Sequence, residues 1–118
     1  MSCDKLLPYG IKKSSVKKET DKKMKILVLG DISRSSSCKY VCDRLWRYRK
    51  DNGIDFVVVN GENCAETNGI DKNSANMLFS AGADVITMGN HTFGKREIVP
   101  YLDDTPQIIR PANYAPQA

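Results

Sequence analysis

Histidine and long apolar runs are the two things this sequence has least of. His91 is the only histidine in the chain, which leaves little from which to build a structural zinc site. No window reaches the ~18 to 20 apolar residues that a membrane-spanning helix needs. The N-terminus also lacks the apolar core of a secretory signal. We therefore expect a cytoplasmic protein with no membrane partner.

The cysteines do not compensate for the missing histidines. Cys38 and Cys42 lie four residues apart in a segment of helical character, and the chain has no second closely spaced pair. This spacing is not that of a zinc motif, and a cytoplasmic protein keeps its thiols reduced. Cys64 follows Glu62 and Asn63, but its position alone assigns it no role.

Positive charge is in excess only at the start of the chain. Residues 1–23 hold seven lysines and three acidic residues, whereas residues 24–118 hold eleven basic and eleven acidic residues. The first segment has little to bury, so we predict a basic, disordered tail over 1–23 and one α/β domain over 24–118. The tail is either a solvated leader or a weak RNA contact that acts through counterion release. Met24 is an alternative to Met1 as the first residue of the protein.

Short apolar runs alternate with segments of helical length. The predicted strands are 24–30, 55–60, 84–88 and 107–109, and the predicted helices are about 38–50, 72–80 and 95–102. The order βαβαβ predicts an α/β fold with a parallel sheet, and continuous apolar runs indicate strands buried on both faces. Pro100 should kink or shorten the last helix.

Helix ends and helix faces can also be predicted. One of Ser35, Ser36 or Ser37 is expected to cap the first helix. Asp71 and Gly82 should bound the second helix. The buried stripe of the first helix is predicted to be Val41, Cys42, Leu45 and Trp46, and that of the second is Ala75, Leu78 and Phe79.

Three of the strands end in a glycine followed by residues that can bind a metal. These blocks are GD, GEN and GNH, and they contribute Asp31, Glu62, Asn63, Asn90 and His91. Parallel strands place their carboxyl ends at one edge of a sheet, so these side chains should converge. Hard oxygen donors with one imidazole suit Mn²⁺, Fe or Mg²⁺. A bridging Glu62 and a proton-donating His91 would suit phosphate ester hydrolysis.

Each of these residues also has an ordinary explanation. Asp31 can be a helix cap, Asn63 a turn residue and His91 a loop histidine without a catalytic role. A single such block is weak evidence for a metal. Three blocks, each at the end of a βα unit, favour the metal site.

The blocks together resemble the calcineurin-like metallophosphoesterase superfamily. VNGEN, NGI, AGADVITMGNHTF and IIRPANY resemble its YmdB-like branch, and the resemblance covers residues 24–118. It implies the N-terminal part of an α/β sandwich, two iron or manganese ions, and phosphodiesterase activity on 2′,3′-cyclic nucleotides. It also implies that Asp31, Glu62, Asn63 and Asn90 are metal ligands, with Glu62 shared, and that His91 is the catalytic acid.

The chain departs from the family pattern in two places. Three later histidine ligands have no counterpart, and the first loop, GDISRSSSCKY, lacks the family's glycines. The sequence therefore predicts a truncated metallophosphoesterase domain that holds at most one weakly bound cation. Turnover of cyclic nucleotides or RNA ends should be weak or absent, and one sheet face should lack its cover, which favours a homo-oligomer.

Two other functions stay open at this point. One is a non-catalytic nucleotide-binding or RNA-binding module, and the other is a gene fragment without a function. A mononucleotide-binding Rossmann unit is disfavoured because no GxGxxG follows the first strand.

Overall fold

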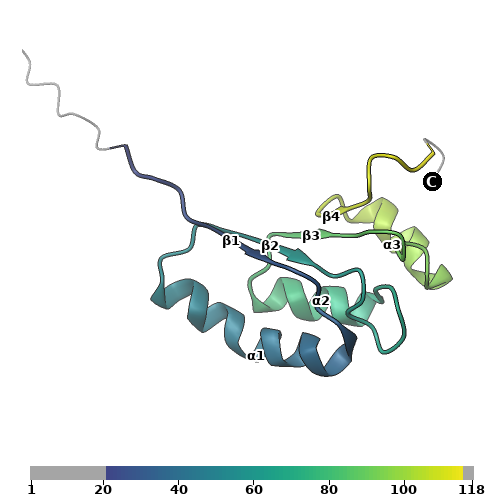
Figure 1. Cartoon of the computed structure of the whole chain (residues 1–118), viewed down its shortest axis with the longest axis horizontal. Coiled ribbons are helices and arrows are strands. Elements are labelled where there is room, and N and C mark those ends of the chain that lie inside the picture. The colour runs from purple at the N-terminus through teal and green to yellow at the C-terminus, as the bar shows by residue number, and fades with distance from the viewer. Residues whose placement is uncertain (1–20, 116–118) are drawn as a thin grey trace, which may run out of the picture.

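A computed structural model describes residues 21–115 of the chain. They form a four-stranded, all-parallel sheet in the order β1-β2-β3-β4, with helices in the connections (Figure 1). The strands are β1 (Ile26–Leu29), β2 (Phe56–Asn60), β3 (Val85–Thr87) and β4 (Ile108–Ile109). The helices are α1 (Arg34–Asp51), α2 (Lys72–Ala81), the 3₁₀ helix η1 (Arg96–Ile98) and α3 (Val99–Asp104). The predicted α/β class and the βαβαβ order are confirmed.

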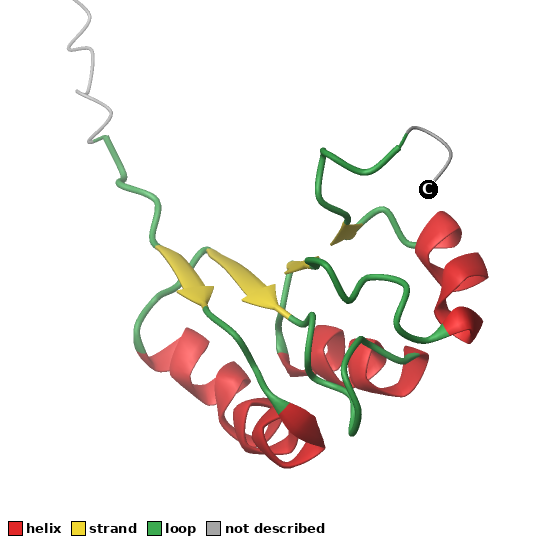
Figure 2. Cartoon of the chain, turned by 45° about the vertical axis from the view of Figure 1, so that its right-hand side comes forward, coloured by secondary structure: helices red, strands yellow, loops and turns green. Residues whose placement is uncertain are grey.

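The helices lie on one face of the sheet, and the hydrophobic core lies between the helices and the sheet. Figure 2 shows α1 and α2 side by side on the same side of the strands. The Tyr101 hydroxyl of α3 donates to Asn76 Oδ1 of α2 over 2.7 Å, so α3 joins the same layer. The strand side chains that point toward this layer are fully or almost fully buried: Val57, Val59, Ile86 and Ile108.

The opposite side of the sheet, which we call the open face, contradicts the expectation that the strands are buried on both faces. Its exposed apolar side chains are Ile26, Val28, Phe56 and Ile109, which expose 56%, 68%, 37% and 49% of their surface. Val58 and Val85 lie between them and are half-buried. Within residues 21–115, this face of the sheet is therefore left largely exposed.

Helix α1 begins earlier than predicted. Its N-cap is Ser33, which makes no side-chain cap bond, and the three serines expected to cap it lie inside the first turns. Leu45 is buried and Val41 and Cys42 are half-buried, as expected, but Trp46 is 63% exposed. An ideal Cβ on Gly82 would lie 3.2 Å from Trp46 Cε3, so the indole lies across the end of α2 instead of entering the core.

Helix α2 has the predicted ends and the predicted buried face. Asp71 Oδ1 accepts the Ser74 amide over 2.7 Å, and Gly82 takes the left-handed conformation at φ 114°. Ala75 and Leu78 are completely buried and Phe79 is half-buried. These contacts fix where the chain leaves α2 and enters β3.

We expect the Asp71→Ala variant to lose about 1 kcal/mol of unfolding free energy, because the cap bond to the first turn is lost. Urea unfolding followed by circular dichroism measures this change. Ser33→Ala, at the α1 cap that makes no such bond, is the matched control and should change stability much less. Equal losses in the two variants would contradict this account of α2.

Pro100 does not kink a helix. The segment starts as the 3₁₀ helix η1, and α3 begins at Val99, so Pro100 falls in the first turn of α3. Proline is tolerated there because the first amides of a helix have no intrahelical acceptor.

Two other expectations concern the ends of the chain and the membrane. Most of the predicted basic tail, residues 1–20, lies outside the described residues, and so does the weak RNA contact assigned to it. Among residues 21–115 no helix combines the length and the apolar character that would let it cross a membrane.

Candidate functional site

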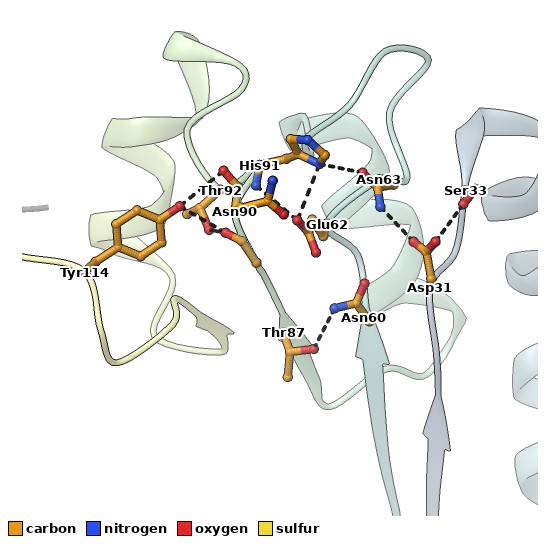
Figure 3. A network of polar contacts seen from close by, with 11 residues as sticks. Asp31, Ser33, Asn60, Glu62, Asn63, Thr87, Asn90, His91, Thr92 and Tyr114 are labelled. Atoms are coloured by element: carbon orange, nitrogen blue, oxygen red, sulfur yellow. Dashed lines mark hydrogen bonds and ion pairs between the residues drawn. The ribbon is translucent and has the colours of Figure 1, made fainter.

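The polar side chains at the strand ends form one hydrogen-bonded row (Figure 3). Asn63 Nδ2 donates to Asp31 Oδ1 over 2.8 Å, and Asn63 Oδ1 lies 2.9 Å from His91 Nδ1. His91 Nδ1 also lies 3.4 Å from Glu62 Oε1. Residues that follow β1, β2 and β3 are thus joined at one edge of the sheet, as the sequence predicts. Asn90 precedes His91 in the same loop and is exposed.

Glu62 is held in place by the loop after β3. Its Oε1 accepts the His91 backbone amide over 3.1 Å, and its side chain is 16% exposed. The carboxylate lies against Gly89: an ideal Cβ on that residue would be 2.4 Å from Glu62 Cδ. Only glycine leaves room for the carboxylate at this position, which explains the glycine of the GNH block.

The network determines which nitrogen of His91 carries a proton. Asn63 donates from Nδ2 to Asp31, so its amide oxygen faces His91. A carbonyl oxygen only accepts, and the proton of a neutral His91 therefore lies on Nδ1. In the doubly protonated ring, a proton given to a substrate would come from Nε2.

The loop after β2 is closed by its own backbone. Gly69 donates its amide to Glu62 O over 2.8 Å, and Ala65 donates to Gly69 O over 3.1 Å. Gly69 has φ 100°, a left-handed conformation that glycine adopts without steric cost. The completely buried Ile70 anchors the end of this loop in the core. The closed loop presents Glu62 and Asn63 at its start.

The first loop shows the consequence of its missing glycines. Arg34 takes φ 68°, and its amide donates to Asn63 O over 2.8 Å. A left-handed conformation costs a non-glycine residue roughly 1–2 kcal/mol. The Arg34 amide bond ties the first loop to the backbone of Asn63, whose side chain donates to Asp31. The loop is therefore strained but still supports the site.

Tyr114 is a supporting residue that the sequence analysis missed. Its hydroxyl donates to Gly89 O over 3.1 Å and to Asn90 O over 3.3 Å. Its ring packs edge-on against Phe93, with 5.2 Å between the ring centroids. In the sequence, Tyr114 stands out only as the last residue of the block IIRPANY. That block does not indicate which residues the tyrosine contacts. Tyr114 fixes the backbone that carries Asn90 and His91.

We expect Tyr114→Phe to speed hydrogen exchange at the His91 amide by up to ~10-fold, the equivalent of one lost neutral hydrogen bond. Native-state exchange by NMR measures this rate. Tyr101→Phe is the matched control, since it removes a tyrosine hydroxyl bond to Asn76 that lies outside the site. Unchanged exchange in Tyr114→Phe, or the same change in both variants, would contradict the role of Tyr114.

Three cysteines meet beneath the site and belong to the core. Cys38 and Cys64 are buried, Cys42 is half-buried, and all three are free thiols, as expected. A hydrogen bond with Cys64 lowers the pKa of Cys38 to about 7, although burial opposes this shift. Burial raises the pKa of Cys42 to about 12. The hydrogen bond with Cys38, followed by burial, raises the pKa of Cys64.

The donor set suits a hard cation better than a soft one. Within residues 21–115, no three side chains of His, Cys, Asp or Glu are grouped as a metal cluster. The row at the strand ends instead combines the carboxylates of Asp31 and Glu62 with the amide oxygen of Asn63. Carboxylate and amide oxygens fit Mn²⁺, Fe²⁺ or Mg²⁺.

Comparisons with known proteins agree with this fold and these blocks. A family model described as "YmdB-like protein" matches residues 27–118. The 2′,3′-cyclic-nucleotide 2′-phosphodiesterase of Bacillus subtilis is 38% identical over 91 residues, which are 77% of this chain and 34% of that protein. The chain thus spans about a third of the length of this relative.

Two solved structures share the fold. A hypothetical protein from Thermus thermophilus superposes with a TM-score of 0.73 at 33% identity, over 80% of this chain and 36% of that one. A structure titled as a novel phosphatase, from Mycoplasma pneumoniae, superposes with a TM-score of 0.73 at 26% identity, over 80% of this chain and 34% of that one.

Proposed function

The chain belongs to the YmdB-like protein family, and from this premise we propose that it contributes one part of a metal-dependent phosphodiesterase active site. The hydrogen-bonded row that links Asp31, Asn63, His91 and Glu62 across three strand ends carries the proposal. These residue types lie at the edge where open parallel sheets bind ligands. The proposed substrates are 2′,3′-cyclic nucleotides or RNA ends, in line with the name of the Bacillus relative.

Four residues of the chain are proposed to hold one divalent cation, iron or manganese. They are Asp31, Glu62, Asn63 and Asn90. A bound cation would supply Lewis acidity toward a phosphoryl oxygen. Glu62 is held in position by its contact with Gly89 and by the His91 amide.

His91 is proposed to donate a proton to the leaving oxygen of the substrate. Its Nδ1 is engaged with Asn63, which leaves Nε2 as the nitrogen for this transfer. Glu62 Oε1 lies 3.4 Å from Nδ1, so the carboxylate and Asn63 together orient the ring. General acid catalysis of this kind contributes ~10² to 10⁴ in rate.

The chain alone should bind metal more readily than it turns over substrate. Four protein donors with water can hold one cation, but they are too few to hold two. The two-ion arrangement that stabilises both the attacking and the leaving oxygen would need further ligands. We therefore propose weak or absent hydrolysis by the isolated chain.

The test is reconstitution of the purified chain with Mn²⁺ or Fe²⁺, with metal bound per chain measured by equilibrium dialysis and elemental analysis. Hydrolysis of bis-p-nitrophenyl phosphate and 2′,3′-cyclic AMP is followed in the same samples. The proposal expects up to one bound equivalent, reduced in Glu62→Gln, with slow turnover at most. Binding that is the same in Glu62→Gln would contradict the metal site. Two equivalents with full turnover, abolished by His91→Ala, would contradict the partial nature of the site.

A further inference from the structure

Three thiols that the proposed function does not use lie together beneath the strand ends. Cys38 and Cys42 come from α1, one helical turn apart, and Cys64 comes from the loop after β2. Cys38 and Cys64 expose 1% and 0% of their surface. The Cys38 sulfur accepts hydrogen bonds from the thiols of both Cys64 and Cys42. A sulfur in contact with two other thiols is placed for disulfide chemistry.

Helix geometry favours one pair among the three thiols. On a helix, residues four apart have Cβ atoms about 5–6 Å from each other, whereas a disulfide needs about 3.5–4.5 Å. Cys38 and Cys42 therefore cannot be bridged without distorting α1. Cys64 instead lies in a loop, where its sulfur would be 3.6 Å from an ideal Cβ on Gly61. A loop can adjust its backbone more easily than the interior of a helix, so Cys64 is the partner that Cys38 can reach.

Cys38 is also the most reactive of the three thiols. The hydrogen bond from Cys64 lowers the pKa of Cys38 to about 7, with help from Cys42, although burial and the charge of Asp71 oppose this shift. About half of Cys38 is then thiolate at neutral pH, and the thiolate is the form that peroxides oxidise. Cys42 stays a neutral thiol, because burial raises its pKa to about 12.

A surface hollow leads toward this pair. It has a volume of 380 Å³, lies between α1 and α2, and is lined by residues that include Cys42, Asn73 and Met77. Cys42 is half-buried at the wall of this hollow, one turn of α1 from Cys38. A molecule as small as hydrogen peroxide needs only a local opening beside Cys42 to reach the Cys38 sulfur.

We propose that Cys38 and Cys64 form a reversible disulfide when the chain meets a hydroperoxide such as hydrogen peroxide. The Cys38 thiolate attacks one peroxide oxygen, the O–O bond breaks, and hydroxide leaves as a sulfenic acid forms on Cys38. The Cys64 sulfur then attacks the Cys38 sulfur, the S–O bond breaks, and water leaves with the Cys64 proton. The two thiols lose two electrons in total. The peroxide gains them and, with both thiol protons, becomes two molecules of water.

The disulfide would tie α1 to the loop that presents Glu62 and Asn63. Cys64 directly follows Asn63, whose backbone oxygen already accepts the Arg34 amide from the start of α1. The new bond would make this attachment covalent. The inference depends on the position of the thiols and not on metal binding or hydrolysis, so it can fail independently of the proposed function.

The test is treatment of the folded full chain, in its Cys3→Ser form, with hydrogen peroxide at neutral pH. Cys3 is replaced because it is a fourth thiol and lies outside the described residues. Remaining thiols are then alkylated, and the chain is mapped by mass spectrometry without reduction. Trypsin places Cys38, Cys42 and Cys64 in three separate peptides, 35–39, 40–44 and 51–72. We expect a linked pair of the first and third peptides, which dithiothreitol separates.

The same treatment of the chain unfolded in urea is the control for the geometry. In an unfolded chain the shorter loop closes more readily, so the link should shift to Cys38–Cys42. Cys42→Ser is the matched variant of the folded chain and should still form the Cys38–Cys64 link. Cys38→Ser should slow oxidation of the remaining thiols at least ~10-fold, because it removes the thiol with the largest thiolate fraction.

The linkage found in the folded chain decides the proposal without any variant of the buried thiols. A Cys38–Cys42 link there would overturn the proposal, as would thiols that stay reduced or that oxidise without forming a link. Oxidation of Cys38→Ser at the same rate as the parent chain would also overturn it, because Cys38 would then not be the thiol that meets the peroxide.

Discussion

The Gly89→Ala variant should fold like the parent chain and bind Mn²⁺ ~10 to 100 times more weakly, the usual cost of losing a contact that orients a ligand. An alanine Cβ would lie 2.1 Å from Glu62 Oε2. The backbone around Gly89 is held by Tyr114 and Thr92, whereas the carboxylate is the free end of a flexible side chain. Glu62 would therefore move, and the proposed ligand would leave its position. Isothermal titration with Mn²⁺ measures the effect.

Gly30→Ala is the matched control for this variant. Gly30 also ends a strand beside a proposed ligand, Asp31, but a Cβ added there would have no atom within 4 Å. Its Mn²⁺ affinity and its unfolding free energy should stay close to those of the parent chain. Equal affinities in Gly89→Ala and the parent would contradict the role given to Glu62.

Arg49→Met should cost about 2–3 kcal/mol of unfolding free energy, because an ion pair and three hydrogen bonds of the guanidinium, one of them from Nε to Ile54 O, are lost together. Arg49 Nη1 lies 2.9 Å from Asp84 Oδ2 and donates to Gly82 O over 2.8 Å. Its Nη2 donates to Asp55 O over 2.9 Å. The Arg49 side chain is 20% exposed, and its guanidinium joins α1 to the residues that precede β2 and β3. Urea unfolding, followed by the fluorescence of the single tryptophan, measures the loss.

Arg47→Met is the control for a surface arginine on the same helix. Its Nε lies 3.6 Å from Asp51 Oδ2, but the Arg47 side chain is 89% exposed. An exposed pair of this kind contributes little, so stability should change by less than ~0.5 kcal/mol. A similar loss of unfolding free energy in both variants would contradict this account. It would mean that Arg49 stabilises the fold only through its positive charge and not through these particular contacts.

The sequence predicts most of the fold because each signal is local. Apolar runs mark the strands, and Asp71 and Gly82 mark the ends of α2 through backbone chemistry that depends on a few neighbouring residues. The predictions for Trp46 and for burial on both sheet faces are wrong for a shared reason. Periodicity shows which side chains could be buried, whereas burial itself depends on whether another layer is present.

The proposed site residues also differ in how far the sequence predicts them. Their convergence follows from parallel topology, so Asp31, Asn63, His91 and Glu62 could be expected to meet before any coordinates. Tyr114 could not be predicted, because its contact with Gly89 depends on where the chain runs after β4. The left-handed backbone conformation of Arg34 could not be predicted either, because arginine gives no sequence signal for a positive φ.

Paramagnetic broadening by Mn²⁺ in the ¹H–¹⁵N spectrum of the chain tests the central claim most directly. Because the effect falls off steeply with distance from the ion, it reports where the cation lies as well as whether it binds. The account predicts early and selective broadening of the side-chain amides of Asn63 and Asn90 and of the backbone amide of His91. It also predicts that Glu62→Gln removes this selectivity. Broadening centred elsewhere, or a uniform loss of signal that is the same in Glu62→Gln, would contradict a metal site at these strand ends.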